Sequence, residues 1–227
     1  MTAPSFADRA VFPIRAVVDT NVFAKTRLYM SPLERRSREG VVRLFWSPWI
    51  VSEVNRVLTW LWLRRTGGDV SDANWRACSI AAKAMFEHVT RMFEVVEDRP
   101  PYPTVWTYEL LDEWDIPIFA AAKSAGAHFI LTENIDDGPP ADQQFGCLRV
   151  WDKVIYTRPR QFLDFLAWTL DEFATVMLPG DAPSYSSWWH PPAECEDPEW
   201  EIVLRLAIRH GTLWPKRSAT VTDEDIA

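Results

Sequence analysis

Short apolar runs recur along the first two thirds of the chain and predict buried strands. They are rich in valine, isoleucine, leucine and aromatic residues, and they span 16–18, 41–46, 93–96, 128–132 and 148–151. Segments with apolar residues at helical spacing separate these runs. Strands that alternate with helices indicate an α/β fold, in which helices cover both faces of a mostly parallel sheet.

Capping residues indicate where several helices begin. Serine followed by proline, a typical start of a helix, occurs at 31–32 and again at 47–48. The second of these helices carries an apolar stripe and is expected to end at Gly67. Two further helices are expected, over 71–92 and over 117–125.

The last third of the chain differs in composition from the rest. Two helical segments, over 162–177 and 199–210, flank a loop rich in proline, serine and tryptophan. We therefore divide the chain into an α/β domain, 14–158, and a helical, tryptophan-rich C-terminal extension, 159–227. The aromatic segment 185–192 leaves three explanations open: packing on the domain, contact with a partner protein, or stacking on RNA.

Charge and cysteine content narrow the possible functions. The chain has 24 Lys and Arg against 32 Asp and Glu, a net charge of −8, which argues against binding nucleic acid through overall charge. Three scattered cysteines are too few for a disulfide framework or a cysteine-based zinc site. We find no secretion signal and no apolar run long enough to span a membrane, so we expect a cytoplasmic protein.

Basic residues that could hold RNA locally form three small groups. Each group can equally be a solvated helix or loop face. The groups are Arg35, Arg36 and Arg38; Arg64 and Arg65; and Arg158 with Arg160.

Several acidic residues lie at strand ends or helix starts. They are Asp19, Glu53, Asp115 and the neighbouring pair Asp136 and Asp137. Ligands bind parallel sheets beyond the carboxyl ends of the strands, so these carboxylates can converge there. Converging carboxylates repel one another and favour a hard divalent cation. The competing explanation is that these acids are helix caps or solvated surface residues, and a short helix capped by Thr20 or Asn21 is expected after Asp19.

Four segments of this sequence resemble the motifs of PIN-domain nucleases. The first is Val-Val-Asp-Thr-Asn-Val at 17–22, and the second is the serine-started helix at 46–58 with its Glu-Val-Asn-Arg-Val-Leu end. The third is Asp-Ile-Pro followed by an alanine-rich helix at 115–122. The fourth, Thr-Glu-Asn-Ile-Asp-Asp-Gly-Pro within 126–139, is similar to the branch of the family that carries Thr-x-Asn-x-x-Asp.

The resemblance implies a three-layer α/β/α fold and a metal-dependent endoribonuclease, often the toxin of a toxin–antitoxin pair. Asp19 and Asp115 would be the main ligands of Mg²⁺ or Mn²⁺, Glu53 would complete the site or orient the attacking water, and Asp137 would bind the metal or its water. Three polar residues, Asn21, Thr132 and Asn134, would orient the carboxylates. The implied partners are an RNA substrate and an antitoxin protein, and dimers are common in the family.

Two positions depart from the family pattern. Much of the family has aspartate where this chain has Asn134, which lacks the charge. The branch with asparagine uses the later aspartate, and this favours Asp137 over Asp136 as the fourth acid. Gly138 replaces a phenylalanine and removes a packing anchor from the turn. The altered fourth motif and the tryptophan-rich extension leave one alternative open, a PIN-like module that binds RNA or protein without turnover. A second alternative keeps the chemistry but cuts structured DNA.

Overall fold

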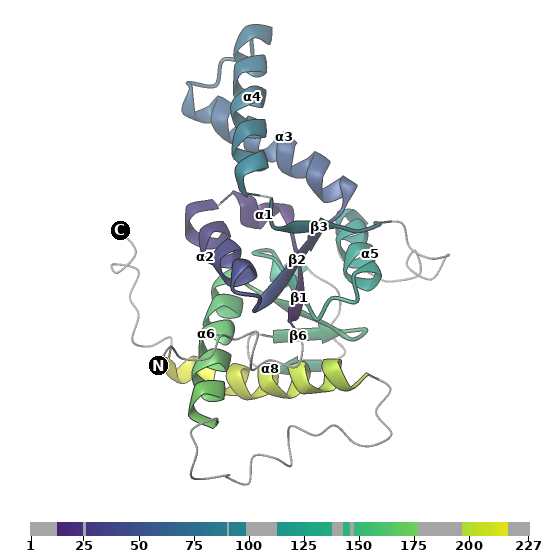
Figure 1. The fold of residues 1–227 in the computed structure, drawn as a ribbon. Coiled ribbons are helices and arrows are strands. Elements are labelled where there is room, and N and C mark those ends of the chain that lie inside the picture. Colours follow the sequence, from purple (N-terminus) through teal and green to yellow (C-terminus); the bar gives the residue numbers. More distant parts are fainter. Residues whose placement is uncertain are drawn as a thin grey trace.

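The computed structural model describes residues 13–24, 26–89, 91–98, 113–137, 143–145, 148–176 and 197–217. Within them the chain forms a seven-stranded sheet with helices on both faces, so the predicted α/β class is confirmed (Figure 1). The strands are β1 (Ile14–Val18), β2 (Val42–Trp46), β3 (Phe93–Val95), β4 (Phe129–Leu131), β5 (Gln143–Phe145), β6 (Leu148–Trp151) and β7 (Val154–Thr157).

The sheet is mostly parallel. Its strand order is β3-β2-β1-β4-β7-β6-β5, and the first five strands in this order run parallel to one another. Strands β6 and β5 extend the sheet as antiparallel neighbours. After β1, the chain adds β2 and then β3 on one side of β1. It later adds β4 and β7 on the other side of β1, so the order of the strands reverses between β1 and β4.

Helices of both the α and 3₁₀ type connect the strands. The α-helices are α1 (Thr20–Phe23), α2 (Thr26–Arg38), α3 (Pro48–Arg65), α4 (Asp72–Val89), α5 (Ile116–Ser124), α6 (Pro159–Val176) and α8 (Pro198–Arg217). The 3₁₀ segments η3 (Glu113–Asp115) and η4 (Ile135–Asp137) precede α5 and follow β4. No described helix is both long and apolar enough to cross a membrane.

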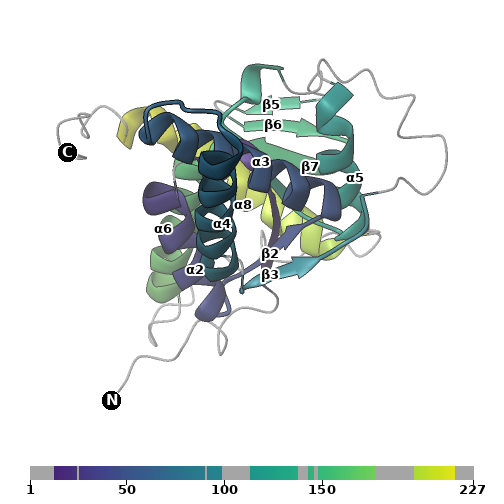
Figure 2. The same cartoon turned by 90° about the horizontal axis from the view of Figure 1, so that it is seen from above.

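Alternating side chains of the strands divide the core between two helical layers. Phe129 of β4 packs against Phe162 and Phe165 of α6, with ring centroids 4.9 and 5.3 Å apart. On the opposite face, Phe119 of α5 packs on Trp151 of β6 at 4.6 Å. Figure 2 accordingly shows α2 and α6 on one side of the sheet and α5 on the other.

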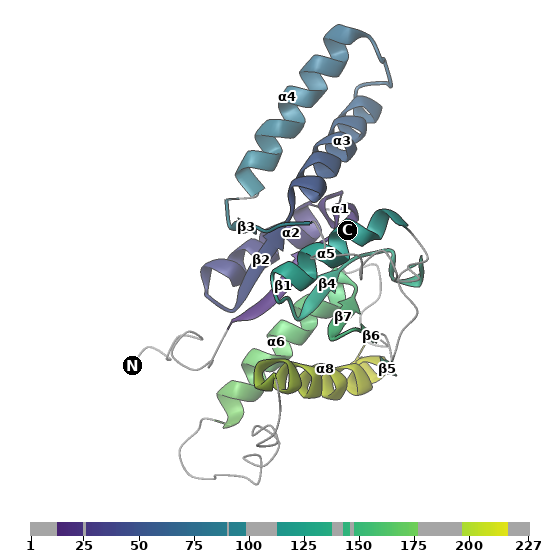
Figure 3. The same ribbon diagram turned by 90° about the vertical axis from the view of Figure 1, so that its right-hand side faces the viewer.

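Helices α3 and α4 form an antiparallel hairpin that extends away from the sheet (Figures 1 and 3). Trp60 of α3 and Trp75 of α4 meet edge to face, with centroids 5.5 Å apart. The root of the hairpin joins the core because Trp46 of β2 stacks on Phe86 of α4 at 4.8 Å. The base of α3, at its N-terminal end, therefore has a fixed position relative to the sheet.

The predicted helix start at Ser31 is wrong, because α2 begins at Thr26 and Pro32 lies inside it. Proline removes one backbone hydrogen bond from a helix interior. The helix continues through it because Tyr29, Met30 and Leu33 are buried in the core. Packing of an apolar face outweighs one lost hydrogen bond here.

The sequence prediction also missed β7, since it placed the last strand at 148–151. A two-residue turn, Asp152 and Lys153, joins β6 to β7, and both residues have positive φ, 43° and 60°. Such tight hairpin turns usually contain glycine or asparagine. Because this turn contains neither, the sequence pattern did not indicate a hairpin.

The two helices beyond residue 158 contribute to the same core as the sheet. Phe162, Leu166, Val203 and Leu206 are all buried within it. Gly211 of α8 lies against β5 and β6, where an added Cβ would come within 3.1 Å of the Phe145 carbonyl oxygen. The aromatic segment 185–192 lies outside the described residues.

Candidate functional site

The candidate site lies where β1 and β4 end, at the point where the strand connections reverse. Asp19 follows β1 and Thr132 follows β4 directly. A crevice at such a reversal, beyond the carboxyl ends of the strands, is the usual ligand position in open α/β sheets. The N-terminal end of α3 follows β2 directly at this edge, and Asp115, at the start of α5, lines a cavity there with Asp19 and Thr132.

Asp19 is the central side chain of this site. Its carboxylate is 4% exposed and caps α1, where the prediction had placed Thr20 or Asn21. Oδ1 accepts from the Thr20 backbone N–H at 2.5 Å and from the Thr20 hydroxyl at 3.0 Å. Oδ2 accepts from the Asn21 amide at 2.5 Å and from the Thr132 hydroxyl at 2.7 Å.

Backbone contacts fix the donors around Asp19. The Asn21 side-chain oxygen accepts from the Glu133 N–H at 3.0 Å, so its amide nitrogen must face Asp19. The Thr132 hydroxyl oxygen accepts from the Asn21 amide at 2.9 Å and from the Asn134 N–H at 3.0 Å. Its single proton therefore points to Asp19. Asn21 and Thr132 thus both donate to Asp19, whereas Asn134 donates only its backbone N–H, to Thr132, and exposes its side chain.

The four hydrogen bonds to Asp19 stabilise its ionised form less than burial destabilises it. Burial raises the pKa of Asp19 above its ordinary value, although hydrogen bonds from Thr132, Thr20 and Asn21 act in the opposite direction. Among the described residues, no lysine or arginine forms an ion pair with Asp19. Buried charges in proteins are normally paired or bound to a metal, so this carboxylate lacks a positive partner.

Asp115 and Tyr156 share a small cavity with Asp19. The cavity has a volume of about 10 Å³, room for roughly one water-sized sphere, and Ile118, Ile130 and Thr132 complete its lining. Asp115 ends η3 at the start of α5, and its side chain does not cap that helix. Tyr156 of β7 lies directly opposite Ile130 of β4, so both side chains project on the face that α5 covers.

The hydroxyl of Tyr156 is buried and has no hydrogen-bond partner among the described residues. Burial, together with the negative charges of Asp115 and Asp19, raises the pKa of Tyr156 well above its ordinary value. An orphaned buried hydroxyl costs free energy, about 1–3 kcal/mol, unless something fills the site. A water molecule would supply the missing hydrogen bond, and a cation with its bound water would supply both that hydrogen bond and the missing positive charge.

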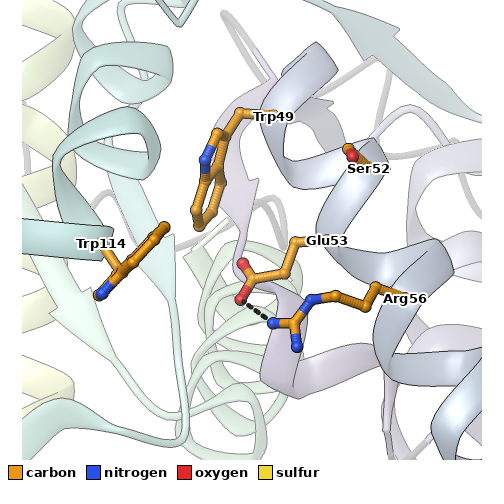
Figure 4. Close-up of a pocket in the computed structure, with 5 residues that line it drawn as sticks. All are labelled: Trp49, Ser52, Glu53, Arg56 and Trp114. Atoms are coloured by element: carbon orange, nitrogen blue, oxygen red, sulfur yellow. Dashed lines mark hydrogen bonds and ion pairs between the residues drawn. The ribbon is translucent and has the colours of Figure 1, made fainter.

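Glu53 lies beside this cavity and lines a second, wider pocket. That pocket has a volume of about 560 Å³ and is lined by Trp49, Ser52, Glu53, Arg56 and Trp114. Burial raises the pKa of Glu53, and the charge of Asp19 raises it further. The Thr20 hydroxyl lowers it when its single proton turns from Asp19 to Glu53. Arg56 forms an ion pair with Glu53 at 3.3 Å (Figure 4). Because the charge of Asp19 acts on Glu53, the wider pocket that Glu53 lines lies next to the cavity that Asp19 lines.

The remaining predicted residues take different positions. The side chain of Asp137 lies outside the described residues, so its predicted role stays a prediction. Asp136 is exposed and forms ion pairs with Arg149 at 3.5 Å and Arg158 at 3.3 Å. Arg160 is exposed. Burial raises the pKa of Tyr29, and the positive charges of Arg160 and Arg158 act to lower it, so both arginines lie near that hydroxyl.

The other basic groups lie apart from the acids or are already paired. Arg36 and Arg38 of α2 form ion pairs with Glu39 and Glu34 at 2.9 and 2.5 Å. Arg64 and Arg65 lie in the last turn of α3. At 1.5 Å per residue, Arg64 is roughly 16 Å along the helix from Glu53.

The donor set suits a hard cation, although it is incomplete among the described residues. Within the described part of the chain, no three His, Cys, Asp or Glu side chains lie close enough to surround a metal ion. Asp19 and Asp115 offer carboxylate oxygens at one cavity, and Mg²⁺ typically binds one or two carboxylates and keeps several waters. The orphaned Tyr156 hydroxyl fits the outer part of such a site.

Several residues of the site were not identified from the sequence, among them Tyr156 and Trp114. Tyr156 was missed together with β7, although Val154-Ile155-Tyr156-Thr157 is a run of β-branched and aromatic residues typical of a strand. Trp114 directly precedes Asp115, but nothing in its sequence context marked it as part of a pocket.

Known proteins add no further identification. No family model matches this chain, and no curated protein matches it.

Proposed function

We propose that this protein is a divalent-metal-dependent endoribonuclease. The observation that carries the proposal is Asp19, a buried carboxylate without a cationic partner among the described residues, which shares a cavity with Asp115. The ordered resemblance of four segments to PIN-domain nuclease motifs supports the same conclusion. A Mg²⁺ or Mn²⁺ ion at this cavity would activate water and neutralise charge on a phosphodiester.

The chain's own residues would divide the work. Asp19 and Asp115 would hold the cation, and Thr132 and Asn21 keep both oxygens of Asp19 in place. Glu53 faces the wider pocket and has a raised pKa, so its carboxylate is a better proton acceptor than an ordinary glutamate. We assign to Glu53 the proton released by the attacking water.

Substrate binding would rely on local rather than overall charge. The net charge of −8 repels a polyanion, so the positive contacts must come from the cation and from nearby arginines. Arg158 and Arg160 follow β7 at the edge of the sheet where the acids lie. We propose that these two side chains contact RNA phosphates.

The test is cleavage of a mixed RNA pool by the purified protein in Mn²⁺, in Mg²⁺ and in EDTA. The proposal predicts cutting only with metal, reduced at least a hundredfold in both Asp19→Asn and Asp115→Asn. Asp115→Asn is the safer variant, because it leaves the hydrogen bonds of Asp19 intact. A single-stranded DNA pool of matched sequence, run alongside, tests the DNA alternative. Metal-independent cutting, or full activity in a folded Asp115→Asn variant, would contradict the proposal.

A second candidate function is an RNA-binding module without turnover. It is favoured by the absence of a three-carboxylate cluster among the described residues and by the four donors that already surround Asp19. This alternative predicts RNA binding in EDTA that is unchanged in Asp115→Asn, and no cutting with any metal.

The resemblance also extends the proposal to a toxin that a small antitoxin protein neutralises. If so, a short open reading frame should lie beside the gene, and its product should copurify with this chain and block RNA cleavage. A copurifying protein that leaves cleavage unchanged would contradict the toxin assignment.

A further inference from the structure

We propose that Trp49 and Trp114 form the two walls of a groove that binds one unstacked base of single-stranded RNA. The proposal deepens the proposed function by naming the form of RNA that the site accepts. It rests on the pocket of about 560 Å³ that these tryptophans line, a size typical of small-ligand sites.

The two indoles come from different elements and approach the same space. Trp49 lies in the first turn of α3, and Trp114 lies in η3, directly before Asp115. Figure 4 shows the Trp49 and Trp114 rings approaching the pocket from these two elements, with the Glu53 carboxylate beside them, on the side of Arg56. A flat base can stack on one or both rings, and every base offers such a face.

The Trp49 wall is held rigidly. The Ser47 hydroxyl caps α3 by accepting from the Ile50 N–H at 3.3 Å, and the Trp49 N–H donates to Asp98 at 2.7 Å. The indole also packs partly on the core. A wall that is fixed before binding loses little conformational entropy when a base arrives.

The Trp114 wall is open to solvent. Its side chain is 71% exposed, an unusual position for a large aromatic ring. Exposed aromatic rings in a groove are surfaces on which the bases of single-stranded nucleic acids stack. Trp114 can therefore cover a base from the solvent side while Trp49 supports it from within.

The groove adjoins the acidic cavity through both walls. Trp49 and Glu53 are four residues apart on α3 and so share one face of the helix. Trp114 and Asp115 are neighbours in sequence. A base held between the indoles would therefore have its phosphate next to the candidate metal ligands, and Arg56 at the rim would face that phosphate.

Single-stranded RNA fits these features better than a protein partner does. The pocket is concave, combines two aromatic faces with an ion pair, and has the size of a small ligand, whereas protein contacts prefer broader, less charged surfaces. A base inside a duplex is already stacked and paired, so it could not enter. The groove predicts selection for single-stranded RNA.

The test measures binding of a short fluorescent single-stranded RNA by anisotropy in EDTA, where the proposed nuclease does not turn over. Trp49→Ala and Trp114→Ala should each weaken binding about tenfold, which corresponds to about 1.4 kcal/mol. Trp60→Ala is the matched control, because Trp60 is also exposed but lies farther along α3, against Trp75 of α4 and outside the lining of the pocket. It should leave the affinity unchanged, and so should all three variants with a duplex of the same sequence.

A scan with abasic ribonucleotides identifies the base that enters the groove. At one position, loss of the base should weaken binding to the wild type and abolish the effect of the tryptophan variants. Unchanged RNA affinity in Trp49→Ala and Trp114→Ala would show that the groove does not bind an RNA base, and this conclusion holds whether or not another partner occupies it.

Cleavage assays separate this inference from the proposed function. If the tryptophan variants bind RNA as the wild type does and still cut it with metal, the base-binding role of the groove is wrong and the proposed nuclease activity stands. Tryptophan-dependent binding without cutting would support the groove and remove the nuclease.

Discussion

At the scale of single residues, Asp19 is held between two opposing effects. Four hydrogen-bond donors favour its ionised form, and burial at 4% exposure disfavours it more strongly. A carboxylate kept in this state is poised for a cation, because a nearby positive charge restores ionisation without further hydrogen bonds. The hydroxyl of Tyr156 lines the same cavity and has no hydrogen-bond acceptor among the described residues.

Tyr156→Phe tests whether that hydroxyl serves the site. In EDTA the variant should be as stable as the wild type or more stable, because it removes a buried polar group that has no partner among the described residues. With Mn²⁺, RNA cleavage should fall about tenfold, since residues that support metal sites typically contribute 10- to 100-fold. Thermal unfolding and initial cleavage rates measure the two effects.

Tyr29→Phe is the matched control for that experiment. The Tyr29 hydroxyl is hydrogen-bonded to Glu133, and burial raises its pKa to about 12. Its loss should lower stability and leave the metal dependence of cleavage unchanged. If Tyr156→Phe lowered stability in EDTA and kept full activity, the assignment of Tyr156 to the site would be wrong.

At the scale of elements, close packing overrides local propensity at several points. Helix α2 runs through Pro32 because its apolar face is buried. Helix α8 keeps Gly211 in its interior, although alanine normally stabilises a helix by about 1 kcal/mol relative to glycine. The reason is the close approach of α8 to β5 and β6.

Gly211→Ala should therefore destabilise the protein. The new Cβ would lie 3.1 Å from the Phe145 carbonyl oxygen and from Leu148 Cδ1, and the carbonyl belongs to backbone that cannot move easily. Overpacking of this kind costs about 1–3 kcal/mol, more than the gain in helix propensity. Urea unfolding should give a lower unfolding free energy by about 1 kcal/mol. An increase in stability would show that α8 packs less closely on the sheet than described.

The same scale shows how far the sequence predicts this protein. Periodicity and caps were sufficient for β1, β2, β4, α3 and α5, because each of these elements agrees with its local propensity. β7 was missed because its turn, Asp152 and Lys153, lacks the usual residues. The acids Asp19, Glu53 and Asp115 were proposed as site residues from their places at strand ends and helix starts, and that role stays a prediction. The pocket partners Tyr156 and Trp114 were not, because they meet the acids only through tertiary packing.

At the scale of the whole molecule, the buried His128 makes the free energy of unfolding depend on pH. Burial, together with the charge of Arg15, lowers the pKa of His128 to about 3. The unfolded chain binds a proton at this residue below a pH of about 6.5, and the folded protein does so only below about 3. Between these values the unfolded state holds more protons, so stability falls as the pH is lowered.

His128→Asn isolates this effect. Asparagine can still accept the Arg15 backbone N–H, which His128 Nδ1 accepts at 3.1 Å, and it does not titrate. Relative to its value at pH 7, the wild type should lose about 2 kcal/mol more than the variant by pH 5. Asp19 and Glu53, whose raised pKa values favour the fold at lower pH, act in the opposite direction in both proteins and cancel. Equal acid sensitivity in urea unfolding would contradict the neutral, buried state of His128.

The distribution of charge over the molecule predicts how RNA binding depends on salt. Arg160→Ala should reduce the slope of log affinity against log salt concentration by about 0.7, the value for one phosphate contact on a single strand. Arg64→Ala, at the end of α3 away from the acids, should leave the slope unchanged. Equal slopes in the two variants would mean that RNA does not follow the edge of the sheet beside β7.

The most direct test of the whole account is calorimetric titration of Mn²⁺ into the wild type and into Asp115→Asn at neutral pH. The account predicts saturable binding near one ion per chain in the wild type, weakened at least tenfold in a folded variant. Equal heats from both proteins, or none from either, would show that Asp19 and Asp115, at the ends of β1 and η3, do not hold a cation.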